Sequence, residues 1–146
     1  MYETMAEYGG VGLAAPQVYR SLRLLVTEDM PDPETEGGFL ARRSVVINPE
    51  ITLLTDEEIS FYEGCLSVPD LRGQVARIRR IRVRGLDRQA RKLDFEAEGF
   101  PAVVYQHEAD HLNGVVFLDR MRGLSTLSFQ NEFDRFIAPH AGSLEV

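Results

Sequence analysis

PAVVYQHEADHLNG, residues 101–114, is the strongest helical segment of this 146-residue chain. Pro101 suits a first helical turn, where its missing N–H costs no hydrogen bond. Asn113-Gly114 favours the left-handed backbone conformation that commonly ends a helix. Four residues recur at helical spacing on one side of the segment: Val103, Val104, His107 and His111. The stretch therefore predicts a helix whose two histidines face the core.

The same helix carries an H-E-x-x-H pattern made of His107, Glu108 and His111. Burying two imidazoles side by side requires polar partners, and a shared metal ion satisfies both at once. The pattern is short, and two core histidines bonded to carbonyl groups are the alternative. A catalytic metal site of this kind also needs a third protein ligand and leaves a fourth position open for water.

Three positions can be weighed as the third ligand. The longer pattern H-E-x-x-H-x-x-G-x-x-H is matched through Gly114, but Phe117 stands where its last histidine belongs. Glu132 lies among other charges, where a solvated helix residue is the simpler interpretation. Cys65, in a loop bounded by glycine and proline, offers a soft thiolate and is the better ligand, although a lone cysteine is often only a small buried hydrophobe.

Composition limits the class of protein. Hydrophobic residues make up 44% of the chain and charged residues 27%, so one domain over residues 1–146 with a real core is expected. The net charge of −7 disfavours general nucleic-acid binding. No apolar run is long enough to span a membrane. A single cysteine forms no internal disulfide and fits a reducing compartment.

The remaining segments predict several strands and few helices, which is an α+β pattern. Strands are expected over residues 22–27, 44–51, 58–62, 74–85 and 92–97, and helices over 1–8 and, weakly, 124–137. Residues 11–17, 29–38 and 63–70 are expected to be irregular because of their glycine, proline and polar residues. The alternation of arginine with apolar residues over 77–85 indicates a half-buried strand with a solvated face rather than a nucleic-acid patch.

Three blocks resemble the signature motifs of the peptide deformylase family: GVGLAAPQ (residues 10–17), EGCLSVP (63–69) and QHEADHLNG (106–114). They follow the order and spacing of the family, and the three together are highly specific. The resemblance covers residues 1 to about 122; family members usually carry a further segment before the first block. It implies an α+β fold of mostly antiparallel sheets packed around a central helix that carries the metal-binding motif.

The resemblance also implies an activity. The chain is expected to be a metal-dependent hydrolase that removes the N-formyl group from the N-terminal formylmethionine of nascent polypeptides and releases formate. One divalent ion per chain is implied, with Fe(2+) as the physiological ion and Zn(2+) as the alternative. Formyl-Met N-termini are the implied partners, together with the ribosome and without a specific nucleic-acid sequence or a membrane. The implied location is the bacterial cytoplasm, or an organelle if an import signal has been removed.

Carried over position by position, the resemblance assigns roles to particular residues. Cys65, His107 and His111 become the metal ligands. Glu108 becomes the general acid/base. Gln17 and the backbone N–H of Leu66 become the donors that stabilise the oxyanion.

Substrate binding is expected next to these groups. Val103 and Val104 share the face of His107 and can line an apolar pocket for the methionine side chain. Gly10 and Gly12 remove side chains where an extended peptide passes, and Val11 between them can offer backbone hydrogen bonds.

Two other functions remain open at the level of sequence. One is a zinc peptidase that takes Glu132 as its third ligand. The other is a non-catalytic relative that only binds formylated or methionine-bearing N-termini. The presence of Glu108, Gln17 and Cys65 disfavours the second, because a pure binding protein has no use for a general base.

Overall fold

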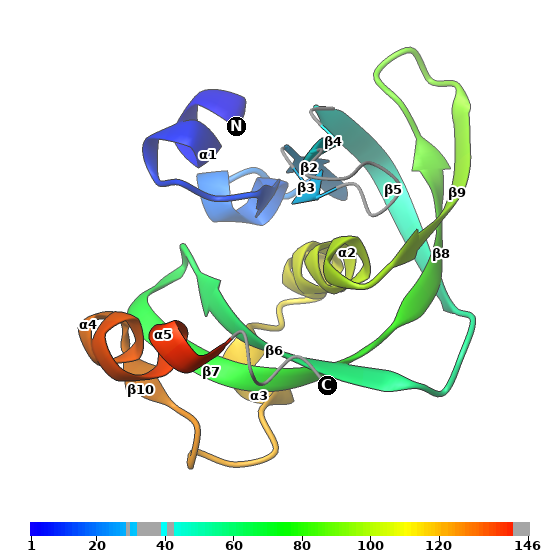
Figure 1. Cartoon of the computed structure of the whole chain (residues 1–146). Helices are drawn as coiled ribbons and strands as arrows, with labels where there is room; N and C mark the ends of the chain where they lie inside the picture. The colour runs from blue at the N-terminus through cyan, green and yellow to red at the C-terminus, as the bar shows by residue number, and fades with distance from the viewer. Residues whose placement is uncertain (29, 32–38, 41–42, 142–146) are drawn as a thin grey trace.

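The computed structural model describes residues 1–28, 30–31, 39–40 and 43–141 (Figure 1). Helix α2, Phe100–Leu112, lies between a larger sheet and a smaller one. The strands pair antiparallel throughout the described residues. The α+β class, with antiparallel sheets around a central helix, is therefore confirmed.

The larger sheet contains, among the described residues, five strands in the order β1-β2-β5-β8-β9. Their bounds are Gly12–Ala14 for β1, Leu24–Thr27 for β2, Ser44–Leu53 for β5, Arg80–Leu86 for β8 and Lys92–Glu98 for β9. The smaller sheet has the order β10-β7-β6. Its strands are β6, Glu58–Cys65, β7, Val68–Ile78, and β10, Ser128–Phe129. A short separate pair joins β3, Met30–Pro31, to β4, Phe39–Leu40.

The other helical elements are short. They are α1, Tyr2–Glu7, the 3₁₀ turn η1, Ala15–Val18, α3, Phe117–Arg120, α4, Gln130–Glu132, the π-helical turn η2, Phe133–Ile137, and α5, Ala138–Ala141. None of the described helices is both long and apolar enough to cross a membrane.

Local signals position α2 at both ends. Pro101 lies in its first turn, and Gly114, just beyond its end, takes a φ of +72°. The guanidinium of Arg23 donates to the carbonyl oxygen of Leu112 and to the side-chain oxygen of Asn113, both at 3.1 Å. Arg23 thus satisfies exposed acceptors at the helix end and ties α2 to the start of β2.

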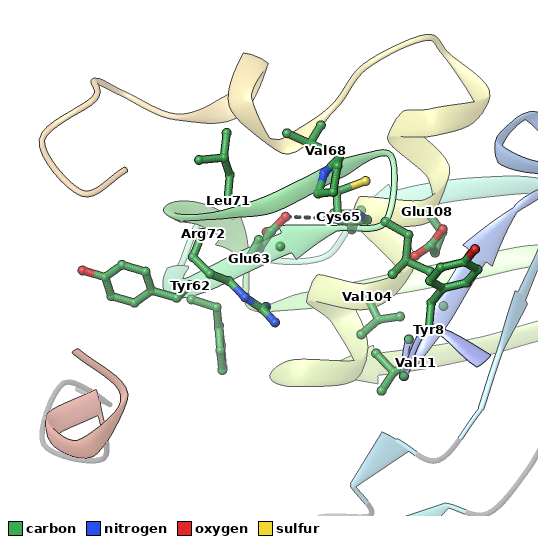
Figure 2. A pocket seen from close by; sticks show the side chains of 18 of the residues that line it. Tyr8, Val11, Tyr62, Glu63, Cys65, Val68, Leu71, Arg72, Val104 and Glu108 are labelled. Carbon is green, nitrogen blue, oxygen red and sulfur yellow. Dashed lines mark hydrogen bonds and ion pairs between the residues drawn. The ribbon is translucent and has the colours of Figure 1, made fainter. Parts of the chain in front are cut away.

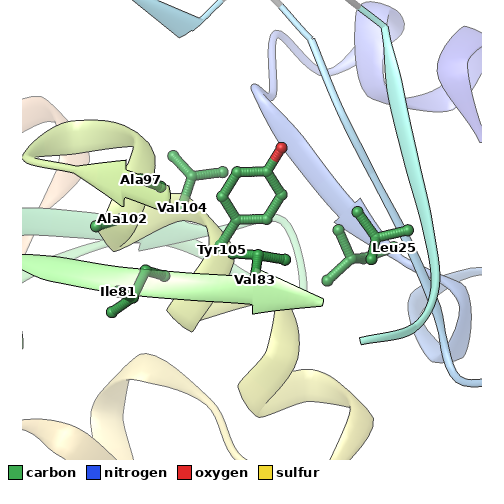
Figure 3. Packing of buried hydrophobic residues seen from close by; sticks show 8 residues of the cluster. Leu25, Ile81, Val83, Ala97, Ala102, Val104 and Tyr105 are labelled. Atoms are coloured by element: carbon green, nitrogen blue, oxygen red, sulfur yellow. The ribbon is translucent and has the colours of Figure 1, made fainter. Parts of the chain in front are cut away.

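The main core lies between α2 and the larger sheet (Figure 3). It consists of Leu25, Val46, Ile81, Val83, Ala97, Ala102, Val104 and Tyr105. Burying each large apolar side chain is worth roughly 1.5–3 kcal/mol, so this face of α2 is firmly held. His107 and His111 are consequently directed away from the larger sheet, toward the β6–β7 hairpin.

The structure departs from the sequence-based expectations in two strands. Residues 11–17 were expected to be irregular, yet Gly12–Ala14 form the edge strand β1, because Pro16 falls only after the strand has ended. Residues 74–85 were expected to form one strand, but the chain passes from β7 in the smaller sheet to β8 in the larger one at Arg79.

Two further segments are more regular than expected. Within residues 63–70, β6 continues to Cys65 and β7 begins at Val68, so only a tight turn separates the strands. The weak terminal helix expected over 124–137 begins at Gln130, after the short strand β10 has paired with β7. Of the loop expected over 29–38, residues 30–31 form β3, and the others lie outside the described residues.

Candidate active site

The centre of the site is the metal group, which consists of the side chains of Cys65, His107 and His111 and can hold a metal ion. Cys65 ends β6, and His107 and His111 lie one turn apart on α2. One ligand atom from each lies within 4.8 Å of the others, and Cys65 Sγ is 3.3 Å from His111 Nε2. The hairpin and the helix therefore bring together the cysteine and the two histidines of separate sequence blocks.

A buried carboxylate orients the first histidine. His107 Nδ1 is 2.7 Å from Glu63 Oε2, so the Nδ1–H donates to the carboxylate and Nε2 remains available for a metal. Arg77 in turn donates two hydrogen bonds to Glu63, at 2.7 and 2.9 Å, and one to Asp110 at 2.6 Å. These buried ion pairs and hydrogen bonds hold the His107 ring in a fixed orientation through its Nδ1.

Sequence reasoning missed this carboxylate, although a signal for it exists. Glu63 lies two residues before Cys65 in β6, and alternation along a strand places such residues on the same face. Arg77 was interpreted as part of a solvated arginine face. That interpretation fits Arg80 and Arg82, which form ion pairs with exposed acidic residues on β9. It does not fit Arg77, which is only 5% exposed and belongs to the site.

The charges in this group influence one another strongly. Burial alone would raise the pKa of the Cys65 thiol, but hydrogen bonds with His107 and His111 lower it to about 6. Burial alone would lower the pKa of His107, but its hydrogen bonds with Cys65 and Glu63 raise it to about 10. Burial would also raise the pKa of Glu63, and its bonds to Arg77 and His107 lower it instead. The group thus already favours a thiolate, the form that binds metal.

Glu108 lies beside the metal group and is almost fully enclosed. Its side chain is 5% exposed, and Oε2 has no hydrogen-bond partner within the described part of the chain. Burial raises the pKa of Glu108 to about 7. Gly12 of β1 makes this position possible, because a Cβ atom there would lie 2.5 Å from Glu108 Oε1.

These residues fit a divalent transition metal. A thiolate and two imidazoles form a donor set used for zinc and iron. Tetrahedral ligation separates sulfur and nitrogen ligands by about 3.5 Å, close to the 3.3 Å between Cys65 and His111. A buried carboxylate oxygen without a partner also calls for a polar occupant beside it. Three candidate ligands beside a buried carboxylate are the residue types that a metal-dependent hydrolase uses.

A pocket of about 510 Å³ opens beside the metal group (Figure 2). Ten of the residues suggested by the sequence line it: Gly10, Val11, Gly12, Gln17, Cys65, Leu66, Val103, Val104, His107 and Glu108. His111 is the exception: it does not line the pocket, but its Nε2 lies 3.3 Å from Cys65 Sγ. The structure therefore brings the suggested catalytic and substrate-binding residues to one cavity.

The two suggested oxyanion donors, Gln17 and Leu66, both line this pocket. Gln17 Nε2 donates to Ser67 Oγ at 3.0 Å and lies 3.8 Å from Cys65 Sγ, while Gln17 Oε1 accepts from the Ala14 N–H at 2.8 Å. Its amide group is therefore held with the N–H side toward the metal group. Leu66 directly follows Cys65 and is 38% exposed.

Val11 lines the pocket, but its backbone carbonyl is already engaged. The Glu28 N–H donates to that oxygen at 3.0 Å. Hydrogen-bonded and non-hydrogen-bonded pairs alternate along antiparallel strands, so the neighbouring Gly12, opposite Thr27, directs its N–H and C=O away from β2. The Gly12 N–H and C=O therefore face the open side of β1, whereas the Val11 carbonyl oxygen is engaged by Glu28.

Neither of the other two positions weighed from the sequence contributes a ligand atom to the described group. Phe117 is 1% exposed and packs with Cys65 and Val75 in a small core cluster. Glu132 is exposed in α4 and is not part of the described Cys65-centred group.

Several lining residues had no signal in the sequence. They are Tyr8, Phe61, Tyr62, Arg72 and Gln130. Tyr8 follows α1, the two aromatic residues lie on β6, and Gln130 comes from the C-terminal segment. Their proximity depends on tertiary packing and strand register, which no local pattern encodes.

Comparison with known proteins agrees with this site. The chain belongs to the polypeptide deformylase family, whose model matches residues 1–126. A curated peptide deformylase from Desulfosudis oleivorans is 44% identical over 137 residues, which are 94% of this chain and 76% of that relative.

Solved structures show the same fold. A class I type b peptide deformylase from Acinetobacter baumannii with Met-Ala-Ser bound has a TM-score of 0.74 at 43% identity, covering 83% of this chain and 76% of that one. Peptide deformylase 1B from Arabidopsis thaliana, in complex with an inhibitor, has a TM-score of 0.73 at 30% identity, covering 99% and 72%. The chain is accordingly a metal-dependent hydrolase that removes the formyl group from N-terminal formylmethionine and releases formate.

Proposed function

We propose that this deformylation uses Cys65, His107 and His111 as ligands of one divalent ion and Glu108 as the general acid/base. The observation that carries the proposal is the close approach of the three ligand atoms, within 4.8 Å, beside a buried carboxylate oxygen that has no partner in the described chain. The ion is proposed to be Fe(2+) physiologically, with Zn(2+) as a substitute, because this ligand set suits both.

Held by Cys65, His107 and His111, a divalent ion would lower the pKa of a bound water molecule and polarise the formyl oxygen. Glu108 accepts a proton from the attacking water and delivers it to the leaving amine nitrogen. Burial raises the pKa of Glu108, which favours its holding the proton between acceptance and delivery. Its burial keeps bulk water away from the proton that it carries.

The formyl oxygen gains negative charge during the attack. We propose that the Gln17 amide and the Leu66 N–H donate hydrogen bonds to it, each worth roughly 3 kcal/mol in comparable sites. The bond from Ala14 to Gln17 Oε1 supports this role, since it leaves the amide N–H groups facing the pocket. Ser67 accepts one of them in the structure and would release it to the substrate.

The peptide is proposed to enter as an additional strand along β1. In the described residues β1 is an edge of the larger sheet, and an extended peptide can pair with such an edge. Gly12 would supply the backbone hydrogen bonds, and Gly10 gives the peptide room. Val103 and Val104 would then contact the methionine side chain.

The first test compares substrates. The enzyme should release formate from a formyl-Met peptide and favour it over the formyl-Gly analogue by at least ~10-fold in kcat/KM, because burying a side chain of this size is worth roughly 1.5–3 kcal/mol. A formate assay on both peptides measures this preference. Absence of formate release would contradict the proposed function, whereas equal rates would show that the apolar pocket lies elsewhere.

A second test concerns the carboxylate behind His107. Glu63→Gln should weaken metal binding by about 10–100-fold, the usual cost of removing a partner that orients a metal-binding histidine. Competition with a chelator measures the affinity. Glu58→Gln, an exposed change on the same strand, is the matched control. An unchanged affinity in Glu63→Gln would remove Glu63 from the metal site.

We further propose that the enzyme acts on nascent polypeptides in the bacterial cytoplasm. The bacterial relatives support this placement. Formyl-Met N-termini arise on the ribosome, so association with it would shorten the search for substrate.

A further inference from the structure

Arg120, the last residue of α3, does not line the described pocket and has no part in the reaction proposed above. Its side chain is half-exposed, yet it binds a buried carboxylate through two hydrogen bonds. Arg120 Nη2 donates to Asp110 Oδ1 at 2.7 Å, and Nε donates to Asp110 Oδ2 at 3.1 Å. Two parallel hydrogen bonds between an arginine and a carboxylate fix the orientation of both groups. Arg120 therefore holds Asp110 in one orientation on α2.

Asp110 connects this surface arginine to the group that orients His107. Asp110 Oδ2 also accepts a hydrogen bond from Arg77 Nη1 at 2.6 Å. Arg77 uses its Nε and Nη2 to bind both oxygens of Glu63, and Glu63 accepts from His107 Nδ1. The contacts thus run without a gap from Arg120 through two carboxylates and one guanidinium to a proposed metal ligand.

The balance of charge in this network depends on Arg120. Glu63, Arg77 and Asp110 are all buried. Without Arg120, two buried carboxylates would share one buried guanidinium, and an incompletely paired buried charge is costly. With Arg120 present, each carboxylate binds one arginine through two N–H groups: Glu63 binds Arg77, and Asp110 binds Arg120. Arg77 can therefore keep both of its hydrogen bonds to Glu63.

Helix α3 is anchored on the side of the metal group, which places Arg120 firmly. Phe117, at the start of α3, is 1% exposed and packs in the same small core cluster as Cys65. The Val116 N–H donates to Asp119 Oδ2 at 2.9 Å and so satisfies a backbone group at the start of the helix. The helix also contacts β6 and β7. The position of Arg120 is thus fixed by packing as well as by its own ion pair.

We propose that Arg120 is a positioning residue for the metal group. By binding Asp110, it keeps Arg77 on Glu63, and Glu63 then holds the His107 ring in the orientation that binds metal. The proposal rests on the proposed function, because His107 is there a metal ligand. Arg120 should consequently act on metal affinity rather than through contact with the substrate.

Arg120→Met should lower the affinity for Zn(2+) about 5-fold. The loss should be smaller than the roughly 10–100-fold typical of a direct partner of a ligand, because Arg120 acts through intervening groups. The direct effect of its charge on the ion is small, since solvent screens a half-exposed side chain. Competition between the purified full chain and a chelator for Zn(2+) measures the affinity.

Two further variants make the comparison specific. Arg120→Lys keeps the charge but replaces the planar fork with a single ammonium group, so it should lose less affinity than Arg120→Met. Arg122→Gln is the matched control, because it breaks an exposed ion pair with Glu58 two residues further along the same segment. The control should retain the wild-type affinity.

A double-mutant cycle with Glu63→Gln tests the route of the effect. Arg120→Met should change the Zn(2+) affinity of Glu63→Gln by less than ~2-fold, because the path from Arg120 to His107 passes through Glu63. Independent contributions would instead combine without loss. An undiminished 5-fold effect in the Glu63→Gln background would contradict the proposal. Should Arg120→Met fail to fold, Arg120→Lys takes its place in the cycle, and its loss must vanish in the same way.

Thermal unfolding of the metal-free proteins separates positioning from folding. A lower unfolding temperature with unchanged Zn(2+) affinity in Arg120→Met would show a merely structural contact and overturn the proposal. A wild-type protein that binds no divalent ion would contradict the proposed metal centre and this role together. Wild-type binding with equal affinity in Arg120→Met would overturn the role of Arg120 alone.

Discussion

Glu108→Gln should lower turnover at least ~100-fold while the protein keeps its metal. The carboxylate is not one of the three ligand groups, so metal retention depends on it little. Glutamine has nearly the same shape but can neither accept the proton of the attacking water nor deliver it to the amine, and positioned acid/base groups typically contribute 10²–10⁴-fold. Formate release per bound metal ion is the measurement.

Two comparisons make this result specific. Glu50→Gln is the same chemical change at an exposed position of β5 and should leave turnover unchanged. Thermal unfolding of Glu108→Gln reports whether the enclosed site still folds. Near-normal formate release from a folded, metal-loaded Glu108→Gln protein would remove Glu108 from the mechanism.

The helix that carries this glutamate could be predicted from the sequence because its signals are local. Pro101 and Gly114 mark its ends, and the spacing of His107 and His111 places them on one side of it. The position of Cys65 beside them could not be derived from spacing alone. It depends on the packing of the β6–β7 hairpin against α2, and the sequence pointed to it through ligand chemistry and family motifs.

The parts that the sequence did not reveal depend on long-range packing. Arg77 lies in an alternating arginine pattern, and only its position in β7 rather than β8 separates it from the solvated arginines. Gln130 reaches Arg72 because β10 pairs with β7, and two residues are too short a strand to leave a periodic signal. Gly12 belongs to an edge strand whose glycine content resembles a loop.

Cys65→Ser should have the second large effect, since it removes the proposed soft ligand. A serine hydroxyl ionises far less readily than a thiol whose pKa is already lowered to about 6, and oxygen matches this ligand set less well than sulfur. The loss of metal affinity should exceed the roughly 10–100-fold typical of a partner behind a ligand. Activity should fall with the metal content.

Metal content and formate release, measured together for Cys65→Ser and Glu132→Ala, test the Cys-His-His centre most directly. Glu132 is exposed in α4, so Glu132→Ala should remain loaded and active, while Cys65→Ser should lose both metal and activity. A fully loaded and fully active Cys65→Ser protein, with metal lost instead from Glu132→Ala, would contradict the proposed metal centre.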